Sequence, residues 1–78
     1  MADVEELADR LAQVAEELGD LAFDRLRHAT ESARRNSPPD RAALAEERRL
    51  TRARRAVDKA VSLLREPAGR ADDDFGAP

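Results

Sequence analysis

The sequence predicts an all-α protein, an antiparallel two-helix hairpin that dimerises into a four-helix bundle and carries a disordered acidic C-terminal tail. Two observations predict this fold class. Large apolar residues over 4–21 recur every three and four residues in alternation, which is the spacing of a helix-packing seam. A short Asn-Ser-Pro-Pro segment then interrupts the pattern, and a second helical pattern follows it. We therefore predict a hairpin over residues 1–66 (helix 3–35, turn 36–37, helix 38–65) and a tail over 67–78.

The first helix is predicted to begin at Asp3, because Glu6 three residues later completes a variant of the capping box. Gly19 inside this helix indicates either a close approach by a partner helix or a bend. The seam lies at the a and d positions of a heptad repeat, and alanines occupy the neighbouring e position. The a and d residues are Val4, Leu7, Leu11, Val14, Leu18 and Leu21, and the e residues are Ala8, Ala15, Ala22 and Ala29.

The turn has residue types that end one helix and begin another. Asn36 suits the left-handed conformation that closes a helix, Ser37 suits an N-cap, and Pro38 suits the first helical position. Pro67 disfavours helical geometry at Glu66, so the second helix should end at about residue 65. Because about two residues join the helices, the chain must double back. The apolar stripe of the second helix is Ala43, Leu50, Val57 and Leu64, with Ala53 and Ala60 between them.

The position of the turn predicts which residues of the two helices face each other. Two residues, one from each helix, should lie side by side when their residue numbers sum to about 71. This places Arg25 opposite Glu46 as an ion pair. A second predicted ion pair, Asp24 with Arg49, has a sum of 73. The predicted core layers are Leu7–Leu64, Val14–Val57 and Leu21–Leu50, alternating with Leu11–Ala60 and Leu18–Ala53.

The apolar stripes are wider than one partner helix can cover. Leu, Val and Phe together supply only 15 of the 78 residues, so burial within one hairpin gives little stability. We therefore predict that the hairpin pairs with itself as a homodimer, with another helical protein, or with both. The residues that widen the stripes are Ala8, Ala15 and Ala22 on the first helix and Ala42, Ala56 and Leu63 on the second.

The sequence contains no motif for catalysis, cofactor binding or metal binding. It has no cysteine, and His28 is the only histidine, without a second ligand at metal-binding spacing. Consecutive acids such as Glu16 and Glu17 diverge on a helix and cannot form a catalytic pair. We predict a non-enzymatic protein without a cofactor. The acidic N-terminus and the lack of a long apolar run predict a cytoplasmic protein that does not bind a membrane. The high alanine content and the excess of Arg over Lys suggest a bacterial source.

The charges are unevenly distributed along the chain. Residues 1–24 contain eight acids and one arginine, whereas residues 48–59 contain six bases and one acid. The bases of the second helix form a basic ribbon opposite its stripe: Arg41, Arg48, Arg52, Arg55 and Lys59.

Four residues of the basic ribbon, Arg48, Arg52, Arg55 and Lys59, are candidate partner-binding residues. Three roles stay open for them: salt bridges between subunits on a solvated face, docking of an acidic protein, and phosphate binding in a nucleic acid. The net charge of −3 and the lack of Trp and Tyr count against a nucleic acid.

The tail contains Asp72, Asp73, Asp74 and Phe75, three negative charges beside an aromatic residue. This segment is a candidate docking peptide, a solubilising extension, or a competitor for the basic ribbon. We recognise no family in the sequence. The function that we predict is a small protein–protein interaction module that acts through helix packing, and the alternative is a nucleic-acid accessory protein that uses the basic ribbon.

Overall fold

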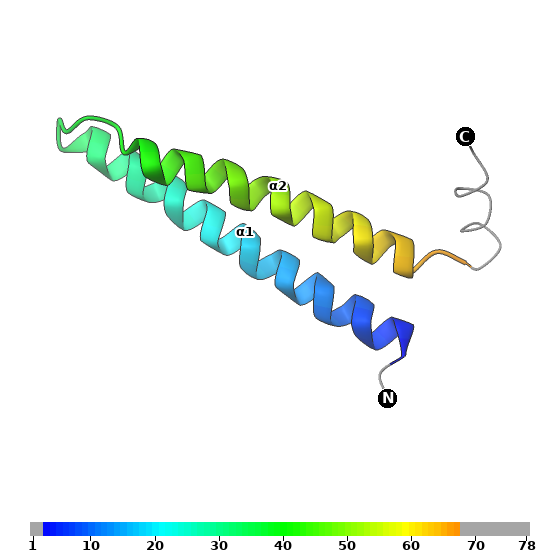
Figure 1. The fold of residues 1–78 in the computed structure, drawn as a ribbon. Helices are drawn as coiled ribbons and strands as arrows, with labels where there is room; N and C mark the ends of the chain where they lie inside the picture. Colours follow the sequence, from blue (N-terminus) through cyan, green and yellow to red (C-terminus); the bar gives the residue numbers. More distant parts are fainter. Residues whose placement is uncertain (1–2, 68–78) are drawn as a thin grey trace, which may run out of the picture.

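A computed structural model describes residues 3–67, which form two antiparallel helices packed side by side (Figure 1). Helix α1 spans Val4–Arg34 and helix α2 spans Arg41–Leu64, so the predicted all-α hairpin is confirmed. Neither helix is long and apolar enough to cross a membrane, within the part of the chain that the structure describes. The predicted tail residues Asp72, Asp73, Asp74 and Phe75 lie outside the described residues.

The ends of α1 match their predicted chemistry. The Asp3 carboxylate accepts a hydrogen bond from the backbone N–H of Glu6 at 2.8 Å, which confirms the predicted cap. At the other end Asn36 has a φ of 59°, the predicted left-handed conformation. The Ser37 N–H donates to the Ser32 carbonyl at 3.0 Å, and together with Asn36 this is a Schellman-type helix end.

The predicted start of α2 is wrong. Ser37 does not cap this helix. Asp40 does, because its carboxylate accepts a hydrogen bond from the backbone N–H of Ala43 at 3.0 Å. The reason is the order of the two prolines: Pro38 precedes Pro39, and a residue before proline is disfavoured in the helical conformation, so Pro38 is a poor first helical residue after a Ser37 cap. The first residue after both prolines is Asp40, a strong N-cap type.

The core of the hairpin differs from the predicted seam. The most buried residues of α1 are the alanines of the e position, and Ala8 and Ala15 are only 0% and 2% exposed. Leu7, Val14 and Leu21, predicted to be central in the core, are 43%, 43% and 46% exposed. The predicted large-on-large layers are therefore not the buried centre of the core. The remaining buried residues of the core are Ala22 and Ala29 on α1 and Ala43 and Val61 on α2.

Close packing explains why the alanines are inside. Two helices approach nearest where their side chains are smallest, and α1 has a small residue at this position in four successive heptads. The alanines lie one residue after Leu7, Val14 and Leu21, which is about 100° around the helix. When the alanines face α2, these three larger side chains therefore turn toward one side of the hairpin.

The predicted alignment of the helices along their axes is confirmed. Arg25 Nε lies 2.7 Å from Glu46 Oε1, at a residue sum of 71. The predicted pair of Asp24 with Arg49 does not form within the hairpin. Asp24 lies near its neighbours on α1, with Arg25 at 3.4 Å, and the Arg49 guanidinium lies 3.9 Å from Glu46. The predicted seam of α1 does not face α2, because the alanine line does. Relative to the prediction, α1 is rotated about its own axis, and this rotation turns Asp24 away from α2.

Candidate helix-docking face

Exposed apolar side chains from both helices form one face of the hairpin, which we call the apolar face. On α1 these residues recur every seven positions, and on α2 two residues do the same. Leu63 is 44% exposed, much like the three large residues of α1. The apolar face consists of Leu7, Val14 and Leu21 on α1 and Ala56 and Leu63 on α2.

Contacts between the helices show that these residues lie on the same side. Arg25 continues the line of Leu11 and Leu18 at seven-residue intervals, and Glu46 continues the line of Ala53 and Ala60. The contact between Arg25 and Glu46 therefore places both lines on one side of the seam. The residues of the apolar face lie three or four positions from these lines and are their neighbours on the helix surface.

The floor of the apolar face lies between the two helices and is half-buried. Leu11 and Leu18 form it on α1, and Ala53 and Ala60 form it on α2. The face is therefore bulky along α1 and, on α2, low except at Leu63. This difference in side-chain size gives the face a shape that a partner must match.

The two outer edges of the apolar face have opposite charge. Beyond the large residues of α1 lies an acidic edge, and beyond Ala56 and Leu63 of α2 lies a basic edge. The line of the acidic edge also includes Arg10 near the start of α1, so this edge is acidic only toward the turn. By heptad position the acidic edge is Glu17, Asp24 and Glu31, and the basic edge is Arg52 and Lys59. Both edges lie on the outer surfaces of the helices, so Glu17 also lines the depression beside Arg54, and Arg52 also lines the depression beside Glu47.

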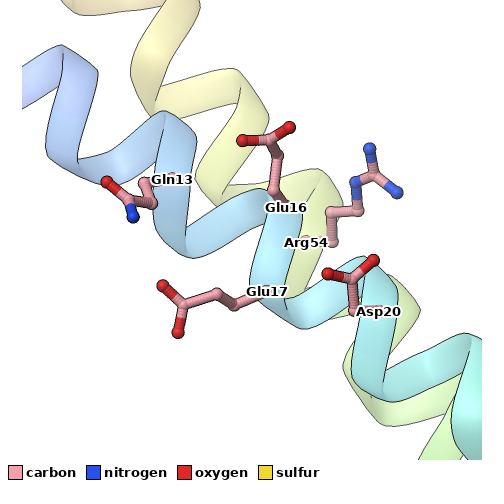
Figure 2. Close-up of a pocket in the computed structure, with 5 residues that line it drawn as sticks. All are labelled: Gln13, Glu16, Glu17, Asp20 and Arg54. Carbon is pink, nitrogen blue, oxygen red and sulfur yellow. The ribbon is translucent and has the colours of Figure 1, made fainter.

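The opposite side of the hairpin is polar. The Arg54 guanidinium lies against the position that a Cβ at Gly19 would take, so Gly19 makes room for this side chain within the continuous helix α1. Arg54 reaches from α2 to a shallow depression on α1, between Glu16 and Asp20 (Figure 2). The other lining residues of the depression are Gln13 and Glu17. Toward the chain ends, Arg65 on this side donates a hydrogen bond to Asp9 at 2.8 Å.

The charged groups of the described residues do not converge on a point. No three His, Asp or Glu side chains within residues 3–67 are placed to hold a metal ion. His28 is exposed, and its Nε2 lies 3.7 Å from Asp24 Oδ2 on the next turn of the same helix.

The structure brings three of the predicted basic residues together on α2. Arg48, Arg52 and Arg55 line one shallow depression with Glu47 and Thr51. The Thr51 hydroxyl donates to Glu47 Oε2 at 2.8 Å, so one acid lies inside this basic surface. The fourth candidate, Lys59, is exposed one turn further along the helix.

Sequence reasoning identified every residue of the apolar face but placed Leu7, Val14 and Leu21 in the core of one hairpin. The signal that could have corrected this is the alanine in each of four successive heptads. A repeated small residue marks the line of nearest helix contact better than a repeated large one. Comparison of the chain with protein-family models, with curated proteins and with solved structures found no match.

Proposed function

We propose that this protein is a non-enzymatic interaction module whose apolar face packs against helices of another chain, which completes a four-helix bundle. The observation that carries the proposal is the exposure of Leu7, Val14, Leu21 and Leu63, at 43–46% each, along one side of the hairpin. Contiguous apolar surface of this kind typically marks a contact with another protein. The chain that covers the face is either a second copy or another helical protein.

The energetics support this role. Complete burial of a large apolar side chain contributes about 1.5–3 kcal/mol, and these four side chains are about half exposed. Covering them should contribute roughly 3–6 kcal/mol for each hairpin. A hairpin with a core made mainly of alanines gains little from its own seam, so this contribution stabilises the folded chain as well as the complex.

Photocrosslinking from single positions tests the proposal. A benzophenone amino acid is placed at Val14, in the apolar face, or at Gln13, one residue away and outside it. Irradiation in a lysate of the source cells should give covalent adducts from position 14 and few from position 13. Equal yields at both positions, or no adduct from either, would contradict the proposed function.

The second candidate function, nucleic-acid binding, is supported by the grouping of Arg48, Arg52 and Arg55 around one depression. Phosphates that bind there would displace counterions, so the affinity would fall steeply as salt rises. Titration of fluorescent DNA at 50 and 200 mM salt tests this alternative. An Arg48→Gln/Arg52→Gln/Arg55→Gln variant should lose binding if the alternative is correct, and absence of binding by the unmodified protein at 50 mM salt excludes it.

A further inference from the structure

We infer that the chain that covers the apolar face is a second copy of this protein, related by a two-fold axis parallel to the helices. In this arrangement both turns lie at the same end, and α1 of each copy packs across α2 of the other. The inference rests on the proposed function and names its partner. Three features support it: the sizes of the side chains in the apolar face, the charges along its edges, and the heights of the charged residues along the helix axes.

Side-chain size favours this pairing. The α1 side of the apolar face has Leu7, Val14 and Leu21, whereas the α2 line has Leu63 at the level of Leu7, Ala56 at the level of Val14 and Arg49 at the level of Leu21. A copy that places α1 over α2 sets Val14 against Ala56, the large-on-small contact that interdigitating helices favour, and sets Leu7 against Leu63. The other face-to-face two-fold arrangement, α1 over α1, sets all three large residues of α1 against large residues of the second copy and places the α2 halves, with Ala56 and Leu63, against each other.

Charge selects the same pairing. When α1 lies across α2 of the second copy, the acidic edge of one chain runs beside the basic edge of the other. When α1 lies across α1, Glu17 and Asp24 face acids, and Arg52 and Lys59 face bases. Like charges placed side by side at an interface oppose association, so the second arrangement is disfavoured.

The residue levels place individual charges close together. Two residues, one on each helix, lie at the same height along the helix axes when their residue numbers sum to 71–73. A two-fold axis parallel to the helices leaves that height unchanged in the second copy. Glu17 therefore lies level with residues 54–56 of the second copy, between Arg52 and Lys59. Each of these bases is three or four residues away, about 5–6 Å along the helix axis.

Arg49 adds a further contact. Its side chain is 74% exposed, and its guanidinium lies 3.9 Å from Glu46 Oε2. Asp24 of the second copy lies at the level of Arg49 and belongs to the acidic edge. The pair that the sequence predicts within one hairpin thus forms between two chains in this arrangement.

The polar side of the hairpin does not offer an equivalent surface. Arg54 covers Gly19 there, and the Asp9–Arg65 contact spans the two helices at the open end. Of the large apolar residues on that side, Phe23 and Leu26 are exposed, and they lie near the turn. A second copy therefore gains most by packing on the apolar face.

Charge reversal with rescue tests the arrangement in the full chain. Sedimentation equilibrium at 50 mM salt should show a dimer at micromolar concentration. Glu17→Arg alone, or Arg52→Glu/Lys59→Glu alone, should weaken the dimer at least tenfold, because each places like charges together at both symmetric edges. The triple variant should recover to within about threefold, and circular dichroism should show equal helicity for all of them. If the single-edge variants dimerise as tightly as the unmodified protein, the arrangement is wrong.

A distance measurement tests the direction of the second copy. The chain has no cysteine, so Ser37→Cys in the exposed turn allows a single spin label on each chain. Turns at the same end should give a label-to-label distance below about 30 Å. Turns at opposite ends would lie about 45 Å apart, the length of a 31-residue helix. The longer distance overturns the proposed pairing.

The two proposals can fail separately. A purified protein that remains monomeric at 100 μM overturns the second-copy inference, but an adduct between position 14 and a different protein would still support the interaction module. If position 14 gives no adduct and the protein is monomeric, both proposals are wrong.

Discussion

Arg25 on α1 and Glu46 on α2 form the ion pair that defines the alignment of this hairpin, with Nε and Oε1 2.7 Å apart. The contact is ionic, since the Nε–H of Arg25 forms no hydrogen bond, whereas its Nη1 donates one to Asp24 Oδ2 at 3.4 Å. The pair lies near the turn, with about a third of each side chain or slightly more exposed. It identifies which lines of residues face each other across the seam.

Reversal of this ion pair tests the alignment. Arg25→Glu should lower the free energy of unfolding, and Arg25→Glu/Glu46→Arg should recover part of the loss. The coupling energy should be only about 0.2–1 kcal/mol, because the pair is partly solvated. Urea denaturation followed by circular dichroism measures it. Arg27→Glu is the control, since Arg27 pairs with Asp24 on its own helix, at 3.5 Å. If Arg27→Glu couples equally well to Glu46→Arg, the alignment is wrong.

Enlargement of an alanine tests which residues of α1 face α2. Ala15 is 2% exposed, so Ala15→Leu should force the helices apart and lower the free energy of unfolding by about 1–3 kcal/mol. Ala33→Leu makes the same chemical change at an exposed position of the same helix and should have little effect. Thermal denaturation compares the two. If Ala15→Leu is as stable as Ala33→Leu, the alanines do not form the seam.

Removal of helix caps tests where α2 begins. Asp40→Ala should lower the free energy of unfolding by about 0.5–2 kcal/mol, because the N–H of Ala43 loses its acceptor. Ser37→Ala should change it by much less, since only the backbone of Ser37 forms a hydrogen bond in the turn. Chemical denaturation of both variants is the measurement, and a larger loss for Ser37→Ala would favour the start predicted from the sequence.

Gly19→Ala tests the role of the glycine. The added Cβ would displace the end of the Arg54 side chain, which is flexible and can move. Alanine in a helix interior is favoured over glycine by about 1 kcal/mol, so the variant should be more stable by up to that amount. The gain should be larger in an Arg54→Ala background, where no side chain must move. A loss of stability in both backgrounds would indicate that the backbone of α2 lies over Gly19.

Much of the fold could be predicted because its signals are local. Asp3, Asn36 and the repeated apolar residues specify helices and their ends through interactions within a few residues. The start of α2 was missed because Ser37 and Asp40 are both good cap types. Pro39 decides the choice, because it disfavours helical geometry at Pro38, the residue that would follow a Ser37 cap.

The sequence by itself determined two antiparallel helices and their alignment, since the position of the turn sets which residues lie level, although residues 35–40 join the helices and not the predicted two. The tertiary structure decided the rotation of α1 about its own axis. The apolar stripe of α1 includes both the alanine line and the Leu7–Val14–Leu21 line, and a single partner helix cannot cover both. The heptad pattern is compatible with either line inside the seam. Packing against α2 selects the alanines, because small side chains allow the helices to approach more closely, and this selection leaves the larger residues on the surface as the candidate site.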